Sequence, residues 1–161
     1  MADEKISQMP NASALGGSEQ MAGVQSSANV NITPTQVKTY ITSGSIQSTS
    51  PSAGVGYATG AGSAVTQSSS RTSSVTINAV TGAITLVSAS GSATPATFTV
   101  TNSAVAATDT VIVNQQSGTD LYEIFVTHVT GGSFKITSFT TGGTTSEQPV
   151  FNFAIIKGAA S

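Results

Sequence analysis

From Ser73 onward, apolar and polar residues alternate in short runs. Alternation with a period of two places successive side chains on opposite faces of a strand. Turn sequences such as Ser90-Gly91-Ser92 and Thr141-Gly142-Gly143 separate the runs. The pattern predicts seven strands, at residues 73–79, 83–88, 97–102, 110–114, 122–129, 133–139 and 150–157. Regular short strands with glycine turns indicate an antiparallel β-sandwich or a jelly-roll-like domain.

The same alternation assigns one face of each strand to the interior. The expected interior residues are Val75, Ile77, Ile84, Leu86, Phe98, Val100, Phe134, Ile136, Phe151, Phe153 and Ile155. Thr130-Gly131-Gly132 lies between two of the predicted strands and predicts a tight hairpin, because glycine accepts the backbone angles that such turns require.

Two of the predicted strands are apolar on both faces. Residues 111–113 read Val-Ile-Val, and residues 124–126 read Ile-Phe-Val. A strand of this kind is either central in a sandwich or buried against another subunit. We favour the subunit interface, with Ile112 and Phe125 among its contact residues.

The N-terminal third follows a different pattern. Its sparse apolar residues predict an extended arm with two very short strands, at residues 20–25 and 29–32. Thr33-Pro34 then predicts a helix start, with threonine as the cap and proline in the first turn. Val37, Tyr40 and Ile41 form one apolar stripe, so we expect a short helix at about residues 34–42.

These patterns divide the chain into three parts. Residues 1–43 form an N-terminal segment that carries the short helix, and residues 73–161 form the β-domain. Between them, residues 44–72 are almost entirely serine, threonine, glycine, alanine and glutamine. Since this stretch offers little to bury, we expect a linker or an extended arm there. The fold class is therefore mainly β.

Charge is scarce along the whole chain. Of 161 residues, 7% are charged and the formal net charge is −2, whereas an ordinary domain has about 25% charged residues. The five basic residues are scattered, which argues against nucleic acid as a partner. No apolar run is long enough for a membrane helix, and the N-terminus lacks the pattern of a secretory signal.

The residue types that carry catalysis and metal binding are also scarce. The chain has no cysteine and one histidine, His128, which the alternation places on the same side as Ile124 and Val126. Asp109 and Asp120 lie at predicted strand ends, where aspartate usually bonds to a turn. We therefore predict no enzymatic activity, no cofactor and no metal site; an enzyme acting through Asp120 or His128 is the alternative.

A series of short sequences in the first forty residues points to a known class of proteins. It consists of Glu4-Lys5-Ile6-Ser7-Gln8-Met9-Pro10, Leu15, Gly17-Ser18-Glu19, Val24-Gln25 and Thr35-Gln36-Val37-Lys38-Thr39-Tyr40. This series resembles the N-terminal segment of tailed-bacteriophage virion proteins, with departures at Asn11 and Met21-Ala22. The ending Phe151-Asn152-Phe153-Ala154-Ile155-Ile156-Lys157 is similar to the C-terminal β-domains of small phage structural proteins.

The resemblance implies a structural component of the outer surface of a phage particle, made in the host cytoplasm without a signal peptide. It implies a homotrimer that binds other virion proteins, such as a major capsid protein or a tail adaptor, through its N-terminal segment. A head decoration or cement protein and a short tail fibre fit equally well, and a module that binds host glycans is a further alternative. The expected assembly contacts are Ile6, Met9, Leu15, Val24, Val37, Tyr40, Ile112 and Phe125.

Overall fold

A computed structural model describes residues 21–25, 28–33 and 55–159 of the chain. The chain divides into two units, Met1–Gly56 and Tyr57–Ser161, which we describe separately. The predicted helix at about residues 34–42 lies outside the described residues. The same holds for five of the expected assembly contacts, which are Ile6, Met9, Leu15, Val37 and Tyr40.

The described part of the first unit is a β-hairpin. Strand β1 (Met21–Gln25) pairs antiparallel with strand β2 (Ala28–Ile32), from Met21 opposite Ile32 to Gln25 opposite Ala28. This confirms the two short strands that the sequence predicts. Val24 lies in β1.

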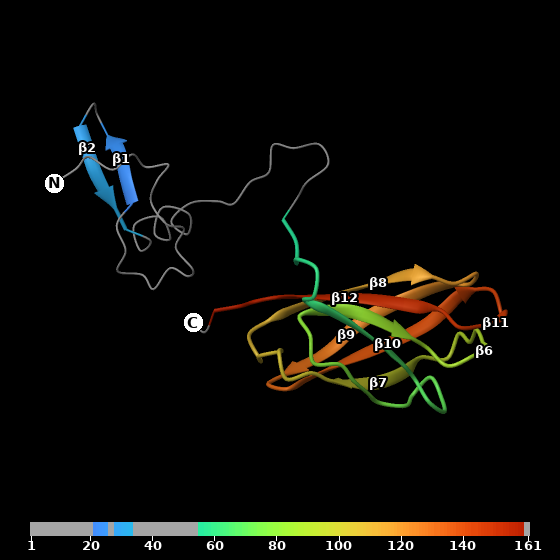
Figure 1. Cartoon of the computed structure of the whole chain (residues 1–161). Coiled ribbons are helices and arrows are strands. Elements are labelled where there is room, and N and C mark those ends of the chain that lie inside the picture. Colours follow the sequence, from blue (N-terminus) through green and yellow to red (C-terminus); the bar gives the residue numbers. More distant parts are fainter. Residues whose placement is uncertain (1–20, 26–27, 34–54, 160–161) are drawn as a thin grey trace. The chain divides into compact units, whose positions relative to one another are not determined.

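The second unit contains two four-stranded sheets and one small sheet (Figure 1). The first sheet has the order β3-β5-β12-β8, with strands Gly62–Thr66, Thr81–Thr85, Val150–Ile156 and Thr110–Ser117. The second has the order β4-β7-β10-β9, with strands Val75–Thr76, Ala96–Thr101, Ser133–Gly142 and Leu121–Thr130. The small sheet pairs β6 (Ala89–Ser90) with β11 (Ser146–Glu147).

The four-stranded sheets are mixed, which corrects the prediction of a purely antiparallel domain. Strand β3 pairs parallel with β5, and β4 pairs parallel with β7, whereas the other pairings are antiparallel. Parallel neighbours need a long crossover connection. The chain supplies one because it passes from β3 to β4 in the other sheet before it returns to β5.

The buried apolar side chains of both sheets form one hydrophobic cluster. The ring of Phe134 in β10 lies 5.4 Å from that of Phe153 in β12, and Tyr122 in β9 meets Phe151 in β12 edge-on at 5.6 Å. All eleven residues that the alternation assigns to the interior are buried. This part of the sequence prediction is confirmed.

The hairpin between β9 and β10 is also as predicted. Thr130 pairs with Ser133, so Gly131 and Gly132 form the turn. Gly132 has a φ of +87°, a conformation that glycine adopts without steric cost.

Strand β3 lies within residues 44–72, where we expected an arm. Only Val65 in β3 packs against the hydrophobic cluster, and the other side chains of the strand are exposed. An edge strand of this kind is held by its backbone hydrogen bonds, so small polar residues suffice and leave no apolar alternation to detect. The β-domain therefore begins earlier than residue 73.

The register gives the second unit two distinct ends. Gly62 of β3 lies beside Thr81 of β5, which in turn lies opposite Ala154 near the end of β12. We call this the proximal end, because the chain enters β3 and leaves β12 there. At the opposite end, the distal end, lie the end of β3, the small sheet and the turn between β8 and β9 (Figure 1).

Candidate functional site

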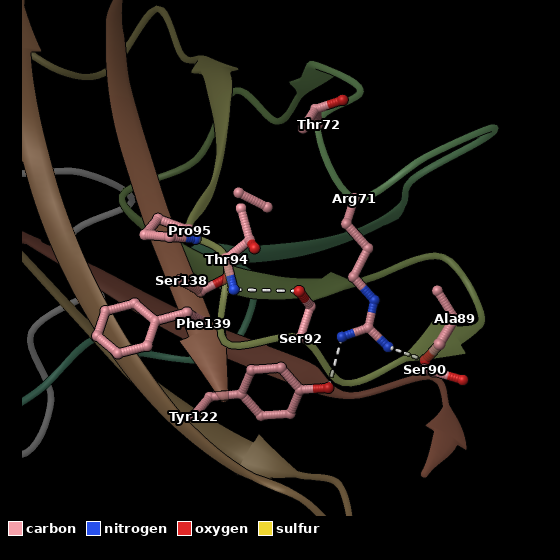
Figure 2. Close-up of a pocket in the computed structure, with 11 residues that line it drawn as sticks. Arg71, Thr72, Ala89, Ser90, Ser92, Thr94, Pro95, Tyr122, Ser138 and Phe139 are labelled. Carbon is pink, nitrogen blue, oxygen red and sulfur yellow. Dashed lines mark hydrogen bonds between the residues drawn. The ribbon is translucent and has the colours of Figure 1, made fainter. Parts of the chain in front are cut away.

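A cavity of about 320 Å³ opens at the distal end of the second unit. Its walls come from the segment after β3, from β6, from the loop between β6 and β7, and from β9 and β10. Figure 2 shows Arg71 and Tyr122 with the loop residues Ser92, Thr94 and Pro95 around it. We call it the end cavity.

The end cavity exists because the interior side chains of β10 and β7 are small at this end. Along β10, the interior face changes from Phe134 and Ile136 to Ser138. Ala96 of β7 lies directly opposite Ser138. Protein interiors are close-packed, so small residues at facing positions leave space that no neighbour fills.

Arg71 is the centre of the hydrogen-bond network at the end cavity. Its Nε donates to the Val87 carbonyl at 3.2 Å, and its Nη2 donates to the Ala89 and Glu147 carbonyls at 2.5 and 2.9 Å. Its Nη1 donates to the Tyr122 hydroxyl at 2.5 Å (Figure 2). The planar guanidinium thereby joins the segment after β3 to the small sheet and to β9.

Tyr122 links the end cavity to the hydrophobic cluster. It is 8% exposed, its ring contacts Phe151, and the Arg71 guanidinium carbon lies 5.4 Å from its ring centre. Burial raises the pKa of the Tyr122 phenol, and the neighbouring Arg71 charge opposes that rise. The hydroxyl therefore stays protonated near neutral pH.

Two carboxylates at the distal end bond to the turns beside the end cavity. Glu147 accepts the N–H of Asp120 at 3.0 Å and also that of Thr119. Burial raises the pKa of the Glu147 carboxyl, but these backbone hydrogen bonds outweigh burial and lower it. The buried Asp120 carboxylate accepts the N–H of Thr145 at 2.8 Å; this residue is 25 positions away, so the bond is not the local turn bond that the sequence predicts.

Asp109 has the same kind of role at the proximal end. Its carboxylate accepts the N–H groups of Ala106 and Gly158 at 2.8 and 3.0 Å and the Lys157 ammonium at 2.5 Å. The Asp109 side chain is inaccessible to solvent, whereas that of Lys157 is 54% exposed. The Lys157 and Ala106 hydrogen bonds lower the pKa of Asp109 from 3.8 to about 2.

His128 lies on the solvent face of β9, which corrects its placement beside Ile124 and Val126. Between the pairs Lys135–His128 and Ile136–Val126 the register shifts by one residue, so no residue of β10 lies directly opposite Thr127. A bulge of this kind moves the residues beyond it to the other face. His128 is therefore exposed.

The side of the unit formed by β8 and β9 is the second candidate site, and we call it the open flank. These two strands are the last in their respective sheets, so each has one edge without a hydrogen-bonded strand neighbour among the described residues, and the two strands contact each other. Ile112 of β8 is 50% exposed, and Phe125 and Leu121 of β9 are 49% and 66% exposed. The Phe125 ring stacks on Phe139 of β10 with 6.2 Å between the ring centres.

Two of the expected assembly contacts can be placed on this flank. Ile112 and Phe125 are exposed on different sheets, and their neighbours Val113, Ile124 and Val126 are only partly buried. The sequence named these two residues as assembly contacts, which stays a prediction, and it pointed to neither Arg71 nor Phe139 as a site residue. The signal for Arg71 is its isolation, since it is the sole basic residue between Lys38 and Lys135.

In comparisons with known proteins, no family model, curated protein or solved structure matches this chain. Among the residues that the structure describes, no helix is long and apolar enough to cross a membrane. Within the same residues, no three histidine, aspartate or glutamate side chains gather into a group that could hold a metal ion.

Proposed function

We propose that this chain is a non-catalytic structural component of a tailed-phage particle. In this proposal it forms a homo-oligomer, a trimer by the resemblance of its sequence, on the outer surface of the virion. The N-terminal segment binds a capsid or tail protein and the β-domain projects from that attachment. A head decoration protein and a short fibre are the two forms of this role.

The open flank is the observation that carries the proposal. Exposed edge strands pair readily with other chains, and proteins that remain monomeric usually protect them with charges or cover them. Strand β8 carries no charged residue and β9 carries one carboxylate, Glu123, together with His128. The exposed Ile112 and Phe125 add apolar surface to both edges. When the open flanks of two copies come together, almost no charges of the same sign are brought close to one another.

We also assign the β-domain to the β-sandwich class. Support comes from the shared hydrophobic cluster of the two four-stranded sheets and from the ring contacts between β9 and β12 and between β10 and β12. The parallel edge strands β3 and β4 distinguish it from the all-antiparallel jelly roll.

The oligomeric state of the purified full chain tests this role. We expect light scattering after size exclusion to give a multiple of the 16.0 kDa chain mass. The variants Ile112→Thr and Phe125→Thr should shift the chain toward monomer, because each replaces exposed apolar contact area with a polar side chain. Ala64→Thr on β3, at the other edge of the first sheet, is the matched control. A monomeric wild type, or an oligomer that neither variant weakens, contradicts the proposal.

Purified particles distinguish the two forms of the role. Many copies spread over the shell indicate a head decoration protein, whereas a few copies at the tail indicate a fibre. Particles that lack the protein contradict both.

The stacked pair Phe125 and Phe139 favours a second candidate, a module that binds host glycans. Phe125 presents about half of its surface to solvent, and Phe139 also lines the end cavity. Aromatic rings of this kind offer flat apolar surfaces for ligands with apolar faces.

A further inference from the structure

We propose that the end cavity binds one residue of a neutral saccharide. This activity goes beyond the structural role proposed above, and four properties of the cavity support it: its size, its charge, its chemical lining and its place in the fold.

The size of the end cavity matches a small ligand. Its volume of about 320 Å³ lies at the lower end of the range of about 300–1,000 Å³ that ligand sites in proteins occupy. A single sugar ring fits such a space, whereas a lipid chain or an extended peptide does not. Since the cavity is open to solvent on one side, the remaining residues of a longer glycan can continue outward.

The charges around the cavity favour a neutral ligand. Arg71 is the sole charged residue in the lining, and no carboxylate or imidazole lines the cavity. Four hydrogen bonds occupy the Arg71 guanidinium, three of them to backbone carbonyls. Little of its hydrogen-bonding capacity remains for a bound anion, since a guanidinium has only five N–H donors. A cation finds no acceptor with a negative charge.

The chemical lining is that of a site for a polyol. Ser90, Ser92 and Thr94 bring hydroxyl groups to the rim, and the Ser92 oxygen already accepts the N–H of Thr94 at 3.1 Å. That hydroxyl can still donate a hydrogen bond. Pro95 and the ring of Tyr122 contribute apolar surfaces (Figure 2). A sugar ring has hydroxyl groups around its edge and C–H groups on its faces, so it meets both kinds of surface.

The place of the cavity in the fold leaves it accessible. It lies at the distal end, whereas the chain enters and leaves the unit at the proximal end. If the N-terminal segment attaches the protein to a particle, the cavity lies at the end of the β-domain opposite to the end at which the chain enters it. This last point rests on the proposed function; the size, charge and lining of the cavity do not.

Ligand-detected NMR on the full chain tests the proposal. The probes are glucose, galactose and N-acetylglucosamine, with glucuronate and N-acetylneuraminate as charged counterparts. We expect saturation transfer to at least one neutral sugar, with a Kd of about 1–3 mM, which ordinary ligand efficiency gives for a molecule of about twelve heavy atoms.

Two variants connect binding to the cavity. Ala96→Leu fills the space opposite Ser138 and should raise the Kd at least about tenfold. Pro95→Ala removes an apolar ring from the rim and should raise the Kd about fivefold; this variant carries the test if Ala96→Leu does not fold. Ala64→Leu makes the same change as Ala96→Leu at an exposed position on β3 and should leave the Kd unchanged.

The proposal is overturned if no neutral sugar binds at 10 times the expected Kd of about 1–3 mM. It is also overturned if only the charged sugars bind, or if Ala96→Leu and Pro95→Ala bind as tightly as the wild type. These binding measurements do not depend on the oligomeric state of the chain. A failure of the saccharide proposal can therefore be told apart from a failure of the proposed assembly role.

Discussion

Arg71 is the residue on which the distal end depends most. Its guanidinium bonds to carbonyls before and within β6 and within β11, and to the Tyr122 hydroxyl of β9. The three carbonyls lie in a loop and in two-residue strands, which bury little apolar surface of their own. A single side chain with a fixed fork geometry therefore replaces the apolar packing that the small residues at this end do not supply.

Replacing Arg71 with lysine tests this role. Lysine keeps the positive charge but cannot reach several acceptors at once in one plane. We expect Arg71→Lys to lower the free energy of unfolding by about 2 kcal/mol, since hydrogen bonds to charged groups contribute about 1.5–3 kcal/mol each and lysine retains part of them. Urea denaturation measures the change.

The reciprocal exchange is the control for that experiment. Lys135→Arg on the exposed face of β10 should change stability by less than about 0.5 kcal/mol. If Arg71→Lys is equally neutral, the guanidinium network does not stabilise the distal end.

Sequence reasoning succeeded for residues whose role depends on local position. Asp109 accepts the N–H of Ala106, three residues before it, as its position at a strand end predicts, whereas Asp120 accepts the N–H of Thr145, 25 residues away. Arg71 could not be assigned in this way, because its acceptors in β6 and β11 lie 18 and 76 residues away. Its role exists only once the strands have been brought together.

At the scale of the elements, the distal turns depend on glycine as much as on hydrogen bonds. Gly143 follows β10 with a φ of +94°, and a Cβ atom there would lie 2.2 Å from an oxygen of the Asp120 carboxylate. The close approach lets Asp120 accept the N–H of Thr145 from inside the turn. Strand β10 can therefore end beside the start of β9.

Alanine at this glycine should be strongly destabilising. We expect Gly143→Ala to lower the free energy of unfolding by about 3 kcal/mol, because the new methyl group combines an unfavourable φ with a clash against a buried carboxylate. Chemical denaturation measures the effect.

Gly131 in the β9–β10 hairpin provides a matched control for Gly143→Ala. A Cβ atom at Gly131 meets nothing within 4 Å and its φ lies outside the left-handed region, so Gly131→Ala should stay within about 0.5 kcal/mol of the wild type. Equal effects of the two substitutions would contradict the role assigned to Gly143.

The strands themselves were predictable to different degrees. The long antiparallel strands β10 and β12 follow the alternation, whereas β9 departs from it at residues 124–126; all three were found from the sequence. Strand β3 was missed because its contacts are backbone contacts and its side chains carry no pattern. The bulge at Thr127 was missed because nothing in the alternation marks an unpaired residue, and His128 was placed on the wrong face as a result.

At the scale of the whole molecule, scarcity of charge makes each buried carboxylate important for acid stability. The pKa of Asp109 is about 2 in the folded protein, below the 3.8 of an unperturbed aspartate. The unfolded carboxyl therefore takes up a proton at higher pH than the folded one. The stabilisation by Asp109 is complete above about pH 4 and disappears as the pH falls from about 4 to about 2.

This linkage predicts the behaviour of Asp109→Asn. The variant should melt at a lower temperature than the wild type at pH 7, because a neutral amide cannot pair with the Lys157 ammonium. When the pH is lowered from 5 to 2, the melting temperature of Asp109→Asn should fall less than that of the wild type, because the variant lacks the Asp109 carboxyl that takes up a proton. Thermal unfolding followed by circular dichroism at several pH values measures both.

Glu123→Gln removes an exposed carboxylate of β9 and serves as the control for Asp109→Asn. It should keep the pH dependence of the wild type. Asp109→Asn with an unchanged pH dependence would contradict the assignment.

The parallel pairing of β3 has a mechanical consequence. A pull between the N-terminal segment and a partner held at the distal end runs along the axis of β3, which pairs with β5 from Gly62 opposite Thr81 to Thr66 opposite Thr85. The backbone hydrogen bonds between β3 and β5 are then loaded together in shear. In a hairpin that is opened at one end, by contrast, the hydrogen bonds break one after another. The Tyr57 hydroxyl, which bonds to the Ile155 carbonyl, reinforces the point where the force arrives. If the N-terminal segment attaches the protein as proposed, the edge strand β3, which we expected to be part of an arm, bears this load.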